Sequence, residues 1–380
     1  MKRIKYIASF DVDSNKEENR LNMLSSANKI NYMLTVMNEL GIGVDIISTS
    51  QTLNKRCYSG KVIKWGNNTL RLFPTTWRGG LLLKIINYVV MRIAMGLYIC
   101  RTVKRNDVVI VYHSSGHLWI PKLLKKKGAY LIEECEEIYG DIFGKPKLAL
   151  KEKTVLKDCN AYIYPTRLLN SIVNKNNAPY LVVHGAYKDV GAKYFSEAAN
   201  EEPSFADKQK YHVGYTGILD PKKGCLDVVR AAEYLDENYH IHMLGFGDEE
   251  TVKQEIEKIK AKTKCELTFD GLRKGKAYTQ YLNHLDLGVC TLNTDQGFVN
   301  TQFPSKIISY MAAGLAVLCS DVEAIRTSDV AEAITFYQGN GPEAIAKGIM
   351  AAREKGNVDT RALLNDCHER FKKEIYELIK

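Results

Sequence analysis

The stretch DLGVCTLNTDQGFVNTQFPSKIISYMAAGLAVLCSD, residues 286–321, decides the fold. Its apolar run at 287–292 predicts a strand, and a polar loop follows. A helical pattern then ends at Gly314, and a second apolar run at 315–319 predicts another strand. The stretch is therefore predicted to be a β-α-β unit, which is the building block of parallel sheets.

The start of that helix predicts an anion site. Pro304 suits a first helical position because it leaves no extra N–H group unsatisfied, and Ser305 beside it can act as a cap. The free N–H groups of a helix start bind anions, and Lys306 adds a positive charge. We therefore expect phosphate to bind here, at the carboxyl ends of parallel strands.

Length and composition indicate a soluble globular protein of two domains. The chain has 380 residues, more than a single core usually contains, with 45% hydrophobic and 26% charged residues. A net charge of +9 suits anionic partners such as nucleotides, phospholipids or nucleic acid. Nucleic acid is not expected, because the chain has no basic stripe interleaved with aromatic residues.

The cysteines and the first residues indicate the cytoplasm. The nine cysteines are scattered singly without a CxxC pair or a Cys/His cluster, so we expect neither disulfides nor a zinc site. The apolar run at the start is too short for a signal peptide.

The longest apolar segment, residues 81–100, raises the question of a membrane. It contains Lys84 and Arg92, each of which would cost about 2.5–3.5 kcal/mol near the centre of a bilayer, so we do not expect a spanning helix. Two alternatives remain, a core helix and a helix resting on a membrane surface. The basic segment that follows, at 101–105, fits the second.

Strands and helices alternate along both halves of the chain. Strands are predicted at residues 4–10, 44–48, 106–113, 129–134, 161–166, 180–185, 211–217, 240–247 and 265–271, and helices at 22–40, 225–235, 249–262, 276–285 and 361–380.

A polar, charged run at 195–210 interrupts this alternation and is the predicted linker. It divides the chain into an N-terminal domain, 1–200, and a C-terminal domain, 201–365. The last residues, 366–380, are expected to form a helix that packs back on the first domain. Two doubly wound halves would enclose a cleft, where the largest ligand site is expected.

The second half resembles a known family. Four segments carry the resemblance, in this order: GYTGILDPKKG (214–224), HMLGFGDEE (242–250), FDGLRKGKAYTQYLNHLDLGVCTLN (269–293) and FPSKIISYMAAGLAVLCSD (303–321). They are similar to the C-terminal domain of retaining GT-B glycosyltransferases of the group 1 kind. The resemblance implies an α/β fold of two Rossmann-like, doubly wound domains and a nucleotide-sugar donor, with no cofactor and no metal.

Several residues are assigned to the donor site through this resemblance. Gly217 would allow a tight turn near phosphate, and Lys223 would neutralise a pyrophosphate. Ile218 stands where the family usually has an arginine, and Lys306 is the expected substitute for the missing charge, with Pro304 and Ser305 beside it. A surface lysine in a turn is the alternative for Lys223.

Two further loops are assigned in the same way. Gly247 would border the sugar or phosphate of the donor, although a plain strand-to-helix turn is the alternative. Gly271 and Leu272 would lie beside the nucleobase.

Two family carboxylates are replaced. Ser309 stands where a glutamate usually binds the ribose, and Thr301 where another meets the donor sugar. Serine can still bond a ribose hydroxyl, but a charge-assisted bond of about 1.5–3 kcal/mol becomes a neutral one of about 1 kcal/mol.

The N-terminal half supplies the candidates for the reacting centre and the acceptor. Glu136 and Glu137 resemble the position that faces the reacting centre, and a solvated acidic loop is the alternative. His113 and Ser114 are expected to contact the acceptor, and His113 could equally be a structural histidine. The acids at 133–137 are so close that some must face solvent or meet basic groups.

These assignments predict a hexosyltransferase. It would move a hexosyl group from a UDP- or GDP-sugar to a saccharide acceptor, lipid-linked and at the inner membrane face, in capsule, exopolysaccharide or other surface polysaccharide synthesis. Contact with anionic membrane follows from the basic, apolar segment. The alternatives are a nucleotide-sugar 2-epimerase and an inactive homologue that serves as a partner or scaffold.

Overall fold

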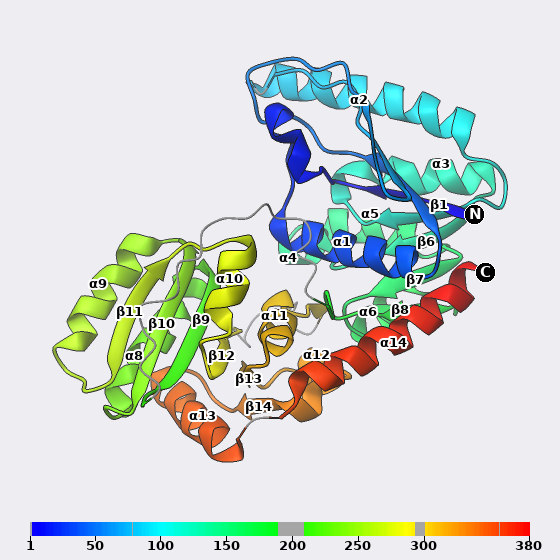
Figure 1. The fold of residues 1–380 in the computed structure, drawn as a ribbon. Coiled ribbons are helices and arrows are strands. Elements are labelled where there is room, and N and C mark those ends of the chain that lie inside the picture. Colours follow the sequence, from blue (N-terminus) through cyan, green and yellow to red (C-terminus); the bar gives the residue numbers. More distant parts are fainter. Residues whose placement is uncertain (1, 78, 189–208, 293–300, 357) are drawn as a thin grey trace. The chain divides into compact units, whose positions relative to one another are not determined.

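The computed structural model describes residues 2–77, 79–188, 209–292, 301–356 and 358–380. Within them the chain forms two compact units, Met1–Val183 with Arg370–Lys380, and His184–Glu369. The predicted linker at 195–210 lies almost entirely outside the described residues. Figure 1 traces the chain in colour from one end to the other.

The first unit is built on a sheet of eight strands in the order β3-β4-β2-β1-β5-β6-β7-β8. These are β1 (Arg3–Ala8), β2 (Gly43–Ser48), β3 (Val62–Trp65), β4 (Asn68–Arg71), β5 (Val108–Tyr112), β6 (Tyr130–Glu134), β7 (Ala161–Tyr164) and β8 (Tyr180–Val182). All neighbours run parallel except β3 and β4, which form an antiparallel hairpin that the sequence did not predict. The order reverses between β1 and β5, where ligands of such sheets bind.

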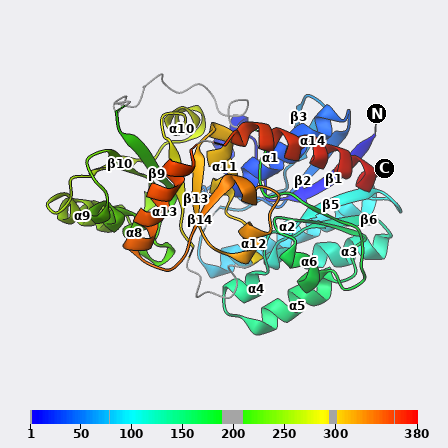
Figure 2. The ribbon, with the colours of Figure 1, turned by 90° about the horizontal axis from the view of Figure 1, so that it is seen from below.

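Helices cover both faces of this sheet. They are α1 (Leu24–Glu39), α2 (Leu81–Thr102), α3 (Trp119–Lys127), α4 (Tyr139–Ile142), α5 (Pro146–Leu156), α6 (Leu168–Val173) and the end of α14 (Thr360–Ile379). Figure 2 shows α1 and α14 on one face and α3, α5 and α6 on the other. The end of α14 is tied to this unit by Phe371, whose ring centroid lies 6.0 Å from that of Tyr32.

The second unit has a six-stranded parallel sheet in the order β11-β10-β9-β12-β13-β14. Its elements are β9 (Tyr211–Leu219), α8 (Cys225–Arg230), β10 (Tyr239–Gly247), α9 (Glu249–Lys260), β11 (Glu266–Gly271), α10 (Gly275–Leu282), β12 (Leu287–Cys290), α11 (Ser305–Ala313), β13 (Ala316–Ser320), α12 (Glu323–Arg326), β14 (Ile334–Tyr337) and α13 (Pro342–Lys355).

The two faces of the second sheet differ in character. Alternate strand residues such as Val213, Ile241 and Leu267 join a hydrophobic core with α8, α9 and α13. The opposite face, under α10 and α11 in Figure 1, carries polar residues, among them Thr216 and three histidines. The predicted α/β class with two doubly wound parallel sheets is confirmed.

The predicted β-α-β unit is present as β12, α11 and β13, with Gly314 at φ 85° ending the helix. One detail of its start is wrong. Pro304 is the extended residue before the helix, Ser305 is the first helical residue, and no side chain caps the helix. Because Ser305 already lies within the first turn, its hydroxyl is not in the N-cap position that accepts from later N–H groups.

Candidate donor site and acceptor-side residues

The centre of the second sheet positions the candidate phosphate site. The strand order reverses between β9 and β12, and ligands of such sheets bind at the carboxyl edge beside this reversal. After β9 the chain makes a short turn to Gly224, which has φ 81°. The Thr291 hydroxyl, just after β12, donates to the Lys223 carbonyl oxygen at 2.5 Å. The turn after β9 therefore contacts the end of β12 at the strand-order reversal.

Lys306 reaches this point from the first turn of α11. Its Nζ lies 4.0 Å from the ring centroid of Tyr215. A Cβ placed on Gly217 would lie 3.7 Å from Lys306 Cε and 3.8 Å from Nζ, so the ammonium group sits beside the Gly217 backbone. The structure thus brings together Lys306 and Gly217, two residues assigned to the donor.

The Lys306 ammonium is arranged to receive an anion. Burial lowers its pKa, and the nearby charge of Lys223 lowers it further, against the opposite influence of three buried cysteines. No carboxylate forms an ion pair with Lys306 among the residues that the structure describes. A partly buried ammonium without a counter-ion is costly, and a bound phosphate would relieve that cost.

Gly247 lies at the same edge of the sheet. It pairs with Leu219 at the end of β9, and its φ of 133° is one that side chains rarely adopt. Two residues earlier, a Cβ on Gly245 would lie 1.8 Å from the Gly217 carbonyl oxygen, so only glycine fits there. The glycines of this loop therefore let β9 and β10 pair up to the candidate site. Asp248 then caps α9 by accepting from the Thr251 N–H at 3.3 Å.

The remaining donor residues lie on neighbouring elements. Gly271 ends β11 with φ 71°, and Leu272 after it is 47% exposed. Ser309 lies one turn after Lys306 on α11 and donates to the Ser305 carbonyl oxygen at 3.3 Å. Thr301 is half-buried, and the loop before it, residues 293–300, is outside the described residues.

In the first unit, the acidic segment after β6 is paired with basic groups. Lys29 on α1 forms an ion pair with Glu136 and lies 3.6 Å from Glu134. The Tyr6 hydroxyl donates to Glu134. Burial raises the pKa of Glu134 to about 7, which Lys29 opposes and Glu136 reinforces. Glu137 is half-buried in the same loop.

The pairing of these acids with basic groups confirms one sequence-based expectation and adds a residue that it missed. The acids do meet basic groups, as their spacing required. Lys29 is 5% exposed and lies at the carboxyl end of β6 with Glu134. Nothing in the sequence distinguished it from other polar residues of an amphipathic helix.

His113 is held by two carboxylates. Its Nε2 lies 2.8 Å from Glu152 Oε1 and its Nδ1 3.4 Å from Glu133 Oε1. Burial lowers the pKa of His113, but both carboxylates outweigh it and raise the pKa to about 9. The side chain is 2% exposed, and these contacts describe a structural histidine, the alternative that the sequence left open. Ser114, next along the chain, is half-buried.

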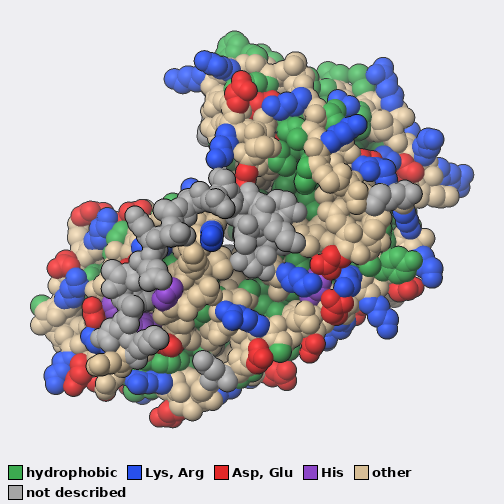
Figure 3. Space-filling model, in the orientation of Figure 1, with side chains coloured by type: hydrophobic (Ala, Val, Ile, Leu, Met, Phe, Trp, Pro, Cys, Tyr) green, Lys and Arg blue, Asp and Glu red, His purple; other side chains and the backbone are tan. Residues whose placement is uncertain are grey.

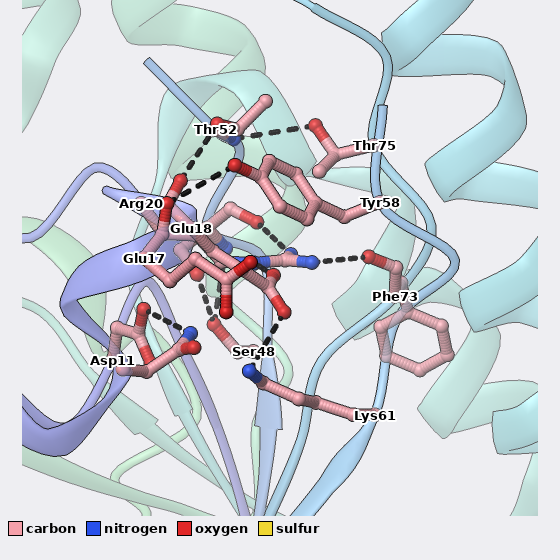
Figure 4. Close-up of polar contacts among 12 residues, drawn as sticks. Asp11, Glu17, Glu18, Arg20, Ser48, Thr52, Tyr58, Lys61, Phe73 and Thr75 are labelled. Carbon is pink, nitrogen blue, oxygen red and sulfur yellow. Dashed lines mark hydrogen bonds and ion pairs between the residues drawn. The ribbon is translucent and has the colours of Figure 1, made fainter. Parts of the chain in front are cut away.

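The loop after β1 is anchored around Arg20, as Figure 4 shows. The buried guanidinium donates to Glu18, to the Ser50 carbonyl oxygen at 3.0 Å and to the Phe73 carbonyl oxygen at 2.9 Å. Lys61 lies 3.0 Å from the other oxygen of Glu18. Burial raises the pKa of Asp11, in the same loop, to about 6. A loop at the strand-order reversal of this sheet is therefore rigidly tied to its neighbours.

Comparisons with known proteins agree with this fold. Residues 210–354 match the family model described as "Glycosyl transferases group 1". No curated protein matches the chain.

Solved structures that resemble the chain do so at low identity. Sucrose-phosphate synthase from Thermosynechococcus elongatus has a TM-score of 0.69 at 15% identity, covering 100% of this chain and 98% of that one. UDP-forming α,α-trehalose-phosphate synthase from Burkholderia vietnamiensis has a TM-score of 0.68 at 9% identity, with 98% and 96% covered. An E. coli trehalose-6-phosphate structure bound with UDP-2-fluoro glucose has a TM-score of 0.66 at 11% identity, with 100% and 99% covered.

These neighbours share the GT-B fold, and the family model matches the unit that contains the candidate phosphate site. The chain has the GT-B fold, and its residues 210–354 match a group 1 glycosyltransferase domain.

Proposed function

We propose that the chain is a retaining hexosyltransferase that uses a UDP- or GDP-sugar. The observation that carries the donor half of this proposal is the partly buried Lys306 ammonium beside Gly217, at the strand-order reversal of the second sheet. The acceptor hydroxyl would attack the anomeric carbon and lose its proton. The nucleoside diphosphate would leave with the electrons of the broken bond.

The leaving group would be stabilised by the protein itself. Lys306, Lys223 and the free N–H groups at the start of α11 supply positive charge where the diphosphate develops negative charge. We propose that this replaces a catalytic metal at the donor site. Gly271 and Leu272 would lie beside the base, and Thr301 and Ser309 beside the sugars. Glu136 or Glu137 would serve the reacting centre, and Ser114 would lie on the acceptor side, next to the structural His113.

A lipid-linked acceptor is favoured by α2. One stripe of this helix, including Met91, Met95 and Ile99, packs into the core of the first unit. Its other side exposes apolar residues, with Leu81 76%, Leu82 71% and Ile93 59% exposed. One face of α2 therefore belongs to the core, and the exposed apolar face supports the surface-helix alternative. By length and composition alone, α2 could cross a membrane. Of its most apolar 18 residues, 22% are buried inside the protein.

The charge around α2 favours an anionic membrane surface. From residue 46 to residue 106 the sequence contains eleven lysines and arginines and no aspartate or glutamate. Figure 3 shows hydrophobic and basic side chains together over the region where Figure 1 places α2. A helix that is apolar on one side and rich in basic residues binds anionic lipid surfaces. We therefore propose a cytoplasmic enzyme at the inner membrane face, acting in capsule, exopolysaccharide or other surface polysaccharide synthesis.

The membrane contact predicts the behaviour of a double variant. Ile85→Asp with Ile93→Asp places two charges on the exposed face of α2, where the side chains are 52% and 59% exposed. Co-sedimentation with vesicles containing phosphatidylserine is expected to fall at least about tenfold, because two apolar anchors are lost and negative charge is added. Added salt should weaken binding of the unchanged protein.

The matched control is Leu150→Asp, which introduces a charge at a 69% exposed leucine on α5 of the same unit. It should leave vesicle binding unchanged. Equal binding by the double variant, or no binding by the unchanged protein at any salt concentration, would refute the membrane contact.

The enzymatic proposal is tested with a panel of UDP- and GDP-sugars and a membrane extract as acceptor. Transfer of labelled sugar into the lipid fraction, with the anomeric configuration kept, is the expected result. Nucleotide binding without turnover on any acceptor would favour a scaffold. This alternative is suggested by Thr301 and Ser309, which stand where the family usually has carboxylates. Inversion of the configuration at the second carbon of the donor sugar, without transfer, would indicate an epimerase.

A further inference from the structure

Three histidines come together on the polar face of the second sheet. His212 lies on β9 and pairs with His240 on β10, and His242 follows two residues later on the same face. Their side chains are buried, with 5%, 3% and 0% exposed. They lie toward the amino ends of their strands, whereas Gly217 and Lys306 mark the carboxyl edge.

The nitrogen atoms have the spacing of a metal site. Nδ1 of His212 lies 3.0 Å from Nε2 of His242. Two nitrogens bound to one zinc ion at 2.0–2.1 Å in a tetrahedral arrangement lie about 3.3 Å apart. One nitrogen from each of the three residues lies within 4.8 Å of the others, and the His240 and His242 ring centroids are 3.8 Å apart.

The surroundings of His242 match the outer shell of a metal ligand. Its Nδ1 lies 3.3 Å from Asp270 Oδ2 and 3.1 Å from the Tyr281 hydroxyl, so Nε2 is the atom directed at His212. Ligand histidines usually donate their other N–H to a carboxylate, which fixes the ring and increases its basicity. Asp270 is thus placed to orient His242.

A carboxylate lies on the solvent side of the cluster. Glu266 Oε2 lies 3.6 Å from His240 Nδ1, and its side chain is 47% exposed. The same oxygen lies 2.7 Å from Lys210 Nζ, so it would have to leave that ion pair to become a fourth ligand.

We propose that His212, His240 and His242 bind one divalent transition-metal ion at a structural site, with Zn²⁺ the best match. Three imidazoles with a carboxylate nearby suit zinc, and they do not suit Mg²⁺ or Ca²⁺, which take oxygen ligands. The ion would join β9 to β10, with Asp270 on β11 and Tyr281 on α10 as its outer contacts. It would stabilise the unit that holds the donor site without taking part in transfer.

Zinc binding is tested on the full chain, without a histidine tag and after treatment with a chelator. Calorimetric titration with Zn²⁺ is expected to show one ion per chain and a higher melting temperature of the protein. His240→Gln and His242→Gln should abolish both effects. Asp270→Asn should weaken binding about 10- to 100-fold, because the orienting carboxylate is lost. His284→Gln, which changes a histidine on the surface of the same unit, should bind as the unchanged protein does.

Two results would overturn the proposal. One is the absence of stoichiometric Zn²⁺ binding by the unchanged protein, and the other is equal binding by His240→Gln. If a variant fails to fold, the visible absorption of Co²⁺ added to the unchanged protein tests the site instead. A tetrahedral nitrogen site gives strong absorption, whereas the octahedral aqueous ion does not, so weak absorption would count against the proposal. UDP binding measured on the same samples separates this site from the donor site.

Discussion

Replacing Lys306 with alanine is expected to weaken the binding of UDP and GDP about 10- to 100-fold. The ammonium lies beside the Gly217 backbone, and no carboxylate pairs with it among the described residues. A hydrogen bond to a charged group contributes about 1.5–3 kcal/mol, which corresponds to about 10- to 100-fold in affinity. Isothermal titration with each nucleotide measures the effect.

The substitution removes packing as well as charge, so a second variant is needed. Lys306→Met keeps the stem that lies over the Tyr215 ring and removes only the ammonium. It should lose as much affinity as the alanine variant if the charge is responsible. Lys347→Ala on α13, an exposed lysine paired with Glu343, is the matched control. Unchanged affinity in both Lys306 variants would show that the phosphate site lies elsewhere.

Nucleotide affinity should also depend on pH. Because burial lowers the pKa of Lys306, its charge is lost at a lower pH than that of an ordinary lysine. Affinity should therefore fall as the pH rises through this lowered value, and a bound diphosphate should oppose the loss by favouring the charged form. In Lys306→Met this part of the pH dependence should disappear.

The donor side of the molecule could be predicted because its signals are local. The run at 286–321 contains two strands, a helix and a terminating glycine in continuous sequence, and all of these are present. Gly217 and Lys306 could be matched because strand order in a doubly wound sheet brings the ends of β9 and β12 together. The one-residue error at Pro304 reflects the weakness of local signals for helix boundaries.

What the sequence did not reveal depends on contacts between distant residues. Lys29 pairs with Glu136 across 107 positions, and neither residue type is unusual in its own segment. The histidine cluster depends on the register between β9 and β10, which sets His212 opposite His240. Its one local sign is the HIH pattern at 240–242, which places two imidazoles on the same face of a strand. A search for zinc sites by close cysteine and histidine pairs could not detect it.

The hydrophobic side of α2 posed a different difficulty. Its apolar spacing predicts a helix equally well whether the second face meets protein or lipid. Only the structure shows that Met91 and Met95 are buried while Leu81 and Ile93 are exposed.

Replacing His113 with alanine is expected to lower the free energy of unfolding of the first unit by about 3–5 kcal/mol, because Glu133 and Glu152 would remain buried without their shared cation. Urea unfolding followed by tryptophan fluorescence reports on this unit, since all three tryptophans, Trp65, Trp77 and Trp119, lie in it. His284→Gln in the other unit should leave the transition unchanged. A loss below about 1 kcal/mol would show that the ion cluster contributes little.

The same cluster gives stability a definite dependence on pH. The pKa of His113 is raised from its ordinary value of about 6.5 to about 9, so its contribution is fully present below 6.5 and is lost as the pH rises through 9. Burial also raises the pKa of Glu133, against the influence of His113. The folded state therefore holds the Glu133 proton more tightly than the unfolded state does. This too makes the folded protein less stable as the pH rises. His113→Gln keeps hydrogen-bonding atoms but cannot titrate. We expect the unchanged protein to lose stability between pH 6.5 and 9 and the glutamine variant to lose much less over that range. Equal pH slopes for the two proteins would mean that His113 is not charged in the folded state.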